Sequence, residues 1–239
     1  RVEKLIHKEH KIYGIRTEFE EFHAPAVILT TGGRTYPSTG STGDGYKIVK
    51  RVGHTVTPLY ATESPLISDE PYIQEKTLQG LSLQDITLRV LNKKGRVLTE
   101  HTMDLLFTHF GISGPAALRC SSFVNKELEK MGEPVMLSLD CFPTQTKQQA
   151  SQKQIQDFVQ LCKEFKLSIN KTFPIEKSFV TGGGVSLKEI HPKTLESKII
   201  DGLYFAGELL DVNGYTGGFN ITAAFATGHV AGMNAGQRA

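Results

Sequence analysis

The sequence predicts an α/β fold in which both ends of the chain build one sheet-centred domain around a β-rich middle region. Continuous apolar runs at residues 26–31 and 203–206 are each followed by glycine, which is typical of strands buried on both faces of a parallel sheet. Between them, residues 60–145 alternate apolar and polar side chains, as half-exposed antiparallel strands do. Because neither end can cover both faces of its own strand, we expect residues 1–58 and 178–239 to form one domain.

Composition narrows the classes of function. The chain has 239 residues, with 27 Lys and Arg, 25 Asp and Glu, three cysteines and a formal net charge of +2. This balance argues against a nucleic-acid or membrane partner, because such proteins carry clustered excess Lys and Arg. No apolar run approaches the roughly 18 residues of a membrane helix. So few cysteines favour a reducing, cytoplasmic setting. Since the chain starts at Arg1 within a predicted strand, we treat it as part of a longer polypeptide.

The first 60 residues contain a predicted ribbon, a buried strand and a short helix. Residues 2–22 resemble an antiparallel ribbon with one wet face, because short alternating segments are separated by charges. Gly32 and Gly33 predict a turn after the buried strand. Residues 43–53 place apolar side chains at near-helical spacing and end in glycine, which predicts a helix.

The middle domain, residues 59–177, is predicted to be β-rich and to contain two helices. One helix is expected after Gly114 and Pro115, because proline is tolerated in a first helical turn and the alanines that follow propagate a helix well. The other is an amphipathic helical insert at about 144–170, where a Gln- and Lys-rich segment carries apolar residues such as Phe158 on one side.

The last domain segment, residues 178–239, repeats the order of strand, glycine turn and helix. A buried strand at 202–208 closes in a glycine turn, and Gly217 and Gly218 open a helix of small residues. The N-terminus of a helix offers unpaired N–H groups with partial positive charge. This order of elements therefore predicts a phosphate- or cofactor-binding unit.

Glycine turns recur along the chain. A single Gly-Gly pair is more often a plain turn than a binding site. Here five turns each lie beside small hydroxyl or carboxylate side chains, at residues 31–33, 41–45, 181–184, 206–208 and 217–220. Their number argues against coincidence.

The longer blocks around these turns resemble the HI0933-like flavoproteins, a family of NAD(P)/FAD-dependent oxidoreductases related more distantly to the fumarate-reductase flavoprotein subunits. The resemblance covers nearly the whole chain and is carried by residues 27–33, 36–46, 106–115, 181–198 and 202–220. It implies an FAD-binding Rossmann-like domain, split by the β-rich middle domain with its short helical insert.

The resemblance also implies which residues bind FAD. Gly32 and Gly33 would line the dinucleotide, Glu208 would lie beside the ribityl chain, and Gly217 and Gly218 would present amides to the flavin ring. A helix N-terminus at that place stabilises negative charge on the reduced flavin. The full set of implied cofactor residues is Thr31, Gly32, Gly33, Thr42, Gly43, Asp44, Gly207, Glu208, Gly217, Gly218, Phe219 and Asn220.

The chain departs from the family pattern in two places. The strand, GxGxxG turn and helix that would hold the cofactor pyrophosphate are absent before Arg1. The helical insert after residues 140–143 is also shorter than in the family. Both departures bear on whether this polypeptide binds FAD without a further segment.

Two residues are weak candidates for contact with substrate. His109 could donate a proton near the flavin, but it has no evident acid or nucleophile partner and fits a structural histidine as well. Tyr215 precedes the predicted flavin-facing glycines and could equally be a turn residue. No metal site is expected, because Asp201, Glu208 and Asp211 do not have ligand spacing.

Two classes of function remain open. The first is an FAD-dependent oxidoreductase that acts on a small organic substrate, with NADH or NADPH as a candidate reductant. The resemblance implies amine oxidation or reduction of a conjugated ketone. The second is a non-enzymatic flavin- or nucleotide-binding module or a redox sensor. Neither a nucleic acid nor a membrane is expected as partner, and the sequence does not indicate an oligomeric state.

Overall fold

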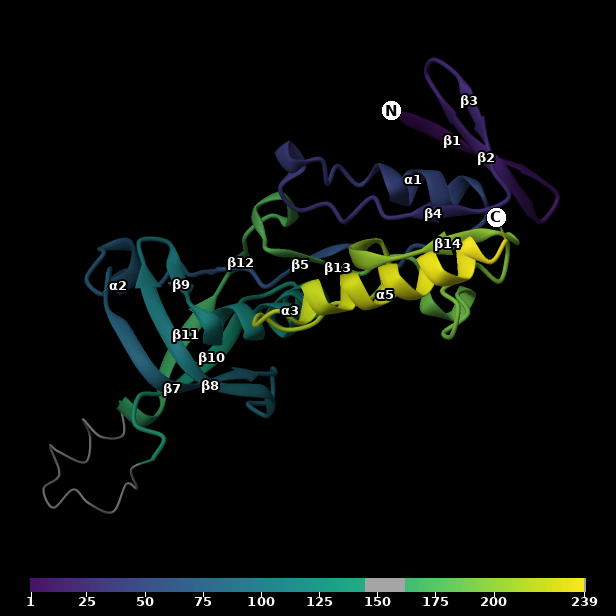
Figure 1. Ribbon diagram of the computed structural model, residues 1–239. Helices are drawn as coiled ribbons and strands as arrows, with labels where there is room; N and C mark the ends of the chain where they lie inside the picture. Colours follow the sequence, from purple (N-terminus) through teal and green to yellow (C-terminus); the bar gives the residue numbers. More distant parts are fainter. Residues whose placement is uncertain (145–161, 239) are drawn as a thin grey trace, which may run out of the picture. The chain divides into compact units, whose positions relative to one another are not determined.

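A computed structural model describes residues 1–144 and 162–238 (Figure 1). The chain divides into two compact units, of which the first contains residues 1–60 and 180–239 and the second residues 61–179. The chain passes between them at β5 (Tyr60–Thr62) and just before β13 (Val180–Gly182). The α/β fold class is confirmed.

The first unit begins with the predicted ribbon. Its antiparallel strands are β1 (Val2–Lys8), β2 (Lys11–Thr17) and β3 (Glu21–His23). Leu5 and Ile12 are buried in the core of the unit, whereas the intervening charged side chains are exposed. Alternation of this kind gives a ribbon with one wet face.

A parallel pair of strands forms the centre of this unit. β4 (Val27–Leu29) pairs with β14 (Leu203–Phe205), with Val27 opposite Leu203. β14 is buried on both faces as expected, but β4 is not, because Ile28 is 37% exposed. On this side Ala231 and Ala235 of the C-terminal helix pack against Tyr204 and Ala206 of the β14 segment, and Ile28 is not part of that cluster.

Helices flank this pair. α1 (Asp44–Arg51) buries Tyr46, Ile48 and Val49 in the same core as β4 and β14. α5 (Phe219–Gly236) contacts β14 (Figure 1). Three short 3-10 helices complete the unit: η1 (Pro37–Thr39), η4 (Leu187–Glu189) and η5 (Gly207–Leu209).

The second unit is a seven-stranded antiparallel sheet with one long helix on a face. The strand order is β11, β10, β7, β8, β9, β6, β12. The strands are β6 (Leu66–Ile67), β7 (Ser82–Leu91), β8 (Val97–Thr108), β9 (Gly111–Ser113), β10 (Val135–Asp140), β11 (Phe165–Ile169) and β12 (Lys171–Thr172). α3 (Pro115–Met131) starts at the predicted proline and packs Ala116, Cys120 and Val124 onto the sheet. Two short helical segments in the described part of the unit are α2 (Pro71–Gln74) and η3 (Ile175–Lys177), and residues 162–163 are also helical.

The predicted helical insert at 144–170 is wrong at its C-terminal end. Residues 165–169 form β11, antiparallel to β10 with Leu137 opposite Leu167. Leu167 and Ile169 are buried and alternate with Ser168, so the apolar period is two rather than that of a helix. Residues 145–161, with the apolar side chains on which the helix was predicted, lie outside the described residues.

The described segments contain no helix with both the length and the apolar content that a bilayer crossing requires.

Candidate functional site

The carboxyl ends of β4 and β14 bring two glycine turns to one edge of the first unit. The strands run parallel, so the turn at residues 31–33 and the turn at residues 206–208 start at the same edge. The Ala206 N–H donates to the Leu29 carbonyl at 3.1 Å, which continues the pairing past the last strand residue. Ligands of open α/β sheets bind at this edge.

Glu208 joins three of the glycine turns. Its Oε2 accepts a hydrogen bond from the Gly33 N–H at 3.1 Å, and its Oε1 accepts one from the Thr181 N–H at 2.7 Å. The Thr181 hydroxyl oxygen in turn accepts from the Arg34 N–H at 2.8 Å. Turns that are far apart in the sequence therefore form one structure, which we call the Glu208 cluster: residues 31–34, 45–46, 181–184 and 206–208.

Tyr46 attaches α1 to the Glu208 cluster. Its phenol donates to the Glu208 backbone carbonyl at 3.1 Å. Burial raises the pKa of Tyr46 well above its usual value, and the charges of Glu208 and Asp211 raise it further. The phenol therefore remains protonated at neutral pH and acts as a donor.

Glycine is needed at two of these positions because neighbouring side chains fill the space beside the backbone. A Cβ at Gly33 would lie 2.7 Å from the Glu208 carboxylate, and one at Gly45 would clash with the Thr31 hydroxyl. Any side chain at either position would push the turns apart. Gly218 differs, because its φ of +92° favours glycine while a Cβ would meet no atom within 4 Å.

The N-terminus of α5 is shaped by the loop before it. Gly218 caps the helix, and the Thr222 N–H donates to its carbonyl at 2.9 Å. The Asn220 side chain makes two bonds to Gly214, accepting from its N–H at 2.7 Å and donating to its carbonyl at 2.8 Å. The side-chain amide of Asn220 is therefore used in closing the loop. Donors toward a ligand would be backbone N–H groups of the first turn.

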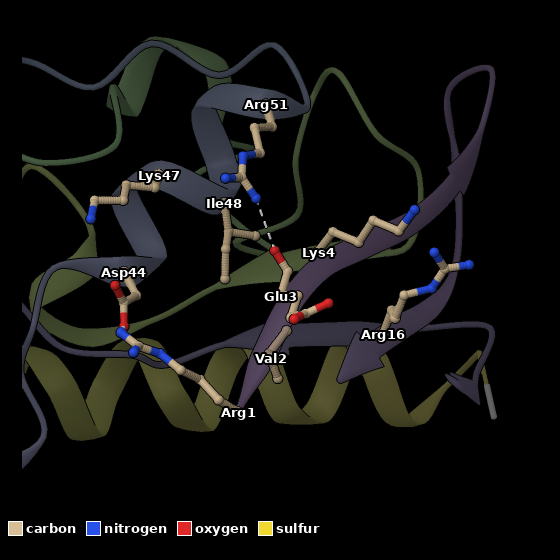
Figure 2. Close-up of a pocket in the computed structure, with 9 residues that line it drawn as sticks. All are labelled: Arg1, Val2, Glu3, Lys4, Arg16, Asp44, Lys47, Ile48 and Arg51. Carbon is tan, nitrogen blue, oxygen red and sulfur yellow. Dashed lines mark hydrogen bonds and ion pairs between the residues drawn. The ribbon is translucent and has the colours of Figure 1, made fainter. Parts of the chain in front are cut away.

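The remaining implied cofactor residues lie near these elements. The Gly207 N–H donates to the Thr227 hydroxyl at 2.9 Å, which fixes α5 to the end of β14. Gly43 caps α1, where the Thr42 hydroxyl donates to Asp44 Oδ2 at 2.7 Å. Asp44 also forms an ion pair with the Arg1 guanidinium (Figure 2). The Phe219 side chain is 60% exposed.

The two candidate substrate contacts belong to different units. His109 is exposed in the turn between β8 and β9 of the second unit, with its ring edge-on to Phe110 at 5.0 Å between centroids. Tyr215, 39% exposed, lies in the loop before α5 in the first unit. Their roles stay predictions. Among the described residues, no group of three His, Cys, Asp or Glu side chains could hold a metal ion.

A buried histidine cluster was not indicated by the sequence. The His54 side chain lies with Nδ1 3.2 Å from Glu189 Oε2 and Nε2 2.8 Å from Ser197 Oγ. Burial lowers the pKa of His54, although Glu189 acts in the opposite direction. Neutral His54 then donates from Nδ1 to Glu189, and its Nε2 accepts from the Ser197 hydroxyl. The partners are 135 and 143 residues from His54, so no local pattern could have shown them.

Ser197, His54 and Glu189 are linked in the order of a nucleophile, a base and an acid, but their role is structural and not catalytic. Ser197 Oγ also accepts hydrogen bonds from the N–H groups of Ile199 and Ile200, at 2.9 and 2.8 Å. Its lone pairs are therefore occupied and the residue is only 4% exposed. A hydroxyl bonded in this way fixes a loop and has no lone pair left to attack a substrate.

Comparison with known proteins gives a consistent set of relatives. A 3-dehydro-bile acid delta(4,6)-reductase of Clostridium scindens is 29% identical over 95% of this chain and 66% of its own length. Ribosomal RNA dihydrouridine synthases of Escherichia coli and Haemophilus influenzae are each 27% identical. These alignments cover 84% and 98% of this chain, and 58% and 66% of the relatives. The chain thus spans about three fifths to two thirds of the length of these relatives.

The family itself follows from a match along almost the entire sequence. The family model described as the HI0933-like protein Rossmann domain matches residues 1–234, which include the Glu208 cluster and the N-terminus of α5. With both units inside the match, the chain belongs to the HI0933-like protein family.

Proposed function

We propose that the protein is a flavin-dependent reductase that adds hydrogen across a carbon–carbon double bond conjugated to a carbonyl group. The observation that carries the proposal is the Glu208 cluster at the carboxyl ends of β4 and β14, with α5 starting beside it. Cofactors of α/β folds bind at this edge, and a helix N-terminus favours the negative charge of a reduced flavin.

The residues of the first unit fit FAD. At Gly218 the backbone is open, since a Cβ there would meet nothing within 4 Å. The first-turn N–H groups of α5 lack intrahelical partners and can donate to the electron-rich edge of a flavin ring. Gly33 leaves no room for a side chain beside the Glu208 carboxylate and the Thr181 hydroxyl, so glycine there lets the turns pack closely at this edge.

The names of the relatives favour reduction over amine oxidation. One is a delta(4,6)-reductase of a 3-dehydro-bile acid, and two are dihydrouridine synthases. Dihydrouridine is uridine with one ring double bond reduced, and that bond is conjugated to a carbonyl, as is the double bond of a steroid enone. A single chemistry therefore covers both: hydride enters at the carbon far from the carbonyl and a proton enters at the adjacent carbon.

Bound FAD in its reduced form would supply the hydride. The chain would supply the positioning: the Glu208 cluster would fix the turns against the cofactor, the N-terminus of α5 would provide backbone donors, and the proton would come from solvent. We propose Tyr215, in the loop before α5, as a contact to the substrate.

The test uses the full-length protein in anaerobic visible spectroscopy. We expect a flavin spectrum that NADH or NADPH bleaches, and that returns when a steroid enone or a uridine-containing RNA is added. Mass spectrometry of the acceptor should show a gain of two hydrogens. Two results would overturn the proposal: absence of bound flavin, or a reduced flavin that no conjugated acceptor reoxidises. The latter would indicate a redox sensor or a binding module.

A further inference from the structure

Two cysteines of the second unit meet beside the end of β10 and the start of β11. Cys141 directly follows β10, and Cys162 lies shortly before β11, the neighbouring strand of the sheet (Figure 1). The Cys141 N–H donates to the Cys162 carbonyl at 2.8 Å, which extends the antiparallel pairing past Leu139 and Phe165. Residues 142–161 separate the two cysteines in the sequence. Both are free thiols, and both are partly buried.

Contacts of the adjacent residues hold the two cysteines in this alignment. Lys163 Nζ pairs with Asp140 Oδ2 at 2.7 Å, and the two side chains are only 10% and 7% exposed. The same Nζ donates to the Phe142 carbonyl at 2.6 Å, and Asp140 Oδ1 accepts from the Phe142 N–H at 3.0 Å. Each cysteine thus has a neighbour in an ion pair that joins the two segments, and salt screens a buried pair much less than an exposed one.

The backbone bond places the two cysteines within the range of a disulfide. Residues that bond opposite one another on antiparallel strands have Cα atoms about 5.5 Å apart. A disulfide joins residues whose Cα atoms are about 4.4–6.8 Å apart. The pKa of the Cys141 thiol is raised by burial, and further by the charges of Cys162 and Asp140, so the two thiols are close enough to act on one another. A disulfide would therefore need little movement of the backbone.

Cys120 provides a contrast within the same unit. It is fully buried on α3, its Sγ lies 4.0 Å from the Leu88 carbonyl oxygen, and burial raises its pKa to about 12. A thiol with so high a pKa stays protonated at neutral pH, and the thiolate is the nucleophile in thiol–disulfide exchange. Cys120 is therefore an inert packing residue and an internal reference for the other two.

We propose that Cys141 and Cys162 form a reversible disulfide by exchange with a low-molecular-weight disulfide such as oxidised glutathione. The Cys162 thiolate attacks one sulfur of the small disulfide, whose S–S bond breaks and releases one small thiol. The Cys141 thiolate then attacks the Cys162 sulfur of this mixed disulfide and releases the second small thiol. Two protein thiols thereby lose two electrons and two protons, which leave on the two small thiols. Cys162 attacks first because the raised pKa of Cys141 keeps that thiol protonated.

The disulfide would tie the end of β10 to the segment before β11 and close residues 141–162 into a covalent loop. In reducing compartments, disulfides of this kind are usually transient and act in catalysis or redox sensing. The exchange requires no flavin and no residue of the Glu208 cluster. The pair would therefore give the second unit a redox-dependent state that is independent of the proposed reductase activity.

The experiment maps the thiols of the full-length protein after equilibration at increasing ratios of oxidised to reduced glutathione. Samples are quenched with acid, alkylated with N-ethylmaleimide in denaturant and digested with trypsin, which cleaves after Lys147 and Lys153 and so separates the two cysteines. We expect mass spectrometry to find the Cys141 and Cys162 peptides as one linked species that lacks two hydrogens, with Cys120 alkylated at every ratio. Dithiothreitol should restore both thiols. In urea, where the fold no longer holds the two residues together, the equilibrium constant for the link should fall about tenfold or more.

The variants separate the roles of the cysteines. Cys141→Ser and Cys162→Ser should each abolish the link, and Cys141→Ser should accumulate the mixed disulfide at Cys162. Cys120→Ala is the matched control, because it removes the remaining cysteine of this chain and should keep the link. Any of four results would overturn the proposal: alkylation of both cysteines at every ratio, glutathione on each cysteine without a link, a link that includes Cys120, or a link that forms as readily in urea as in the folded protein.

Discussion

At the scale of single residues, Glu208 combines a structural role with the predicted cofactor role. Both carboxylate oxygens accept backbone N–H bonds, from Gly33 and Thr181. A carboxylate offers about four lone-pair sites, so two remain for the hydroxyls of a ribityl chain. The resemblance implies the contact to the ribityl hydroxyls. The bonds from Gly33 and Thr181 explain how the turns are held in place for that contact.

Replacing Glu208 should therefore reduce stability and FAD affinity together. Glu208→Ala leaves two partly buried N–H groups without their acceptors, at a cost of about 1–3 kcal/mol in the free energy of unfolding. The loosened turns, with the lost ribityl contact, should weaken FAD binding by about tenfold or more. Urea unfolding and titration of FAD into apoprotein measure the two effects. Glu20→Ala removes an exposed carboxylate of the same unit and should change neither. Equal FAD dissociation constants for Glu208→Ala and Glu20→Ala would remove Glu208 from the cofactor site.

Gly218 permits a cleaner separation of cofactor binding from folding. Its surroundings are open, so Gly218→Val meets no clash in the protein, and the strain of a positive φ costs about 1–2 kcal/mol. The valine would, however, fill the space proposed for the flavin. We expect a folded variant by circular dichroism that has lost its flavin. Gly218→Asn, which tolerates positive φ better, separates strain from occlusion. If Gly218→Val retained stoichiometric flavin, Gly218 would be only a turn residue and not part of the cofactor site.

At the scale of elements, His54 connects three segments of the first unit. It follows α1. Its Nδ1 donates to Glu189 of η4, and its Nε2 accepts from Ser197 in the loop before β14. Its ring also packs edge-on against Phe205 of β14, at 4.8 Å between centroids. One buried side chain thus holds the helix, the 3-10 turn and the central strand together.

This contact predicts a loss of stability at acid pH. Burial lowers the pKa of folded His54 below the usual 6.5, so the unfolded chain takes up the proton first. The stabilisation is complete above the unfolded pKa and declines as pH falls through that value toward the lowered pKa of the folded state. Urea midpoints at pH 7.5 and 5.5 should differ more for the parent protein than for His54→Gln. His7→Gln, at an exposed position, should behave as the parent does. If His54→Gln keeps the full pH dependence, another group is responsible.

The same elements show what the sequence could and could not predict. Glycine turns and the start of α3 at Pro115 follow from local preferences, so they were predictable. The partners of Glu208 and His54 were not, because Gly33 is 175 positions from Glu208, Thr181 is 27 positions from it, and the partners of His54 are 135 and 143 positions away. The residues of β11 were predicted as helix because the Gln- and Lys-rich stretch before them suggested a helix that continued. The alternation of Leu167 and Ile169 with polar neighbours is instead the pattern of a strand.

At the scale of the whole molecule, the first unit is built from both ends of the chain and the second unit from its middle. The implied FAD residues lie without exception in the first unit: 31–44 come from one end of the chain and 207–220 from the other. Ligand binding there would link the two ends thermodynamically, whereas the middle of the chain would gain no direct contact from those residues.

Hydrogen exchange of the full-length protein with and without FAD tests this asymmetry. A ligand that binds only the folded state stabilises it by about 2.7 kcal/mol at a concentration of 100 times the dissociation constant. Amides in segments 31–46 and 206–222 should then exchange up to about 100-fold more slowly, because 1.4 kcal/mol corresponds to a factor of ten. β7 and β8 of the second unit serve as the internal control, since their ladder contains none of the implied FAD residues. Protection confined to one end of the chain would contradict a shared site. Equal protection of β7 and β8 would show that FAD stabilises the molecule globally, and the assignment of the cofactor residues would then need evidence other than exchange.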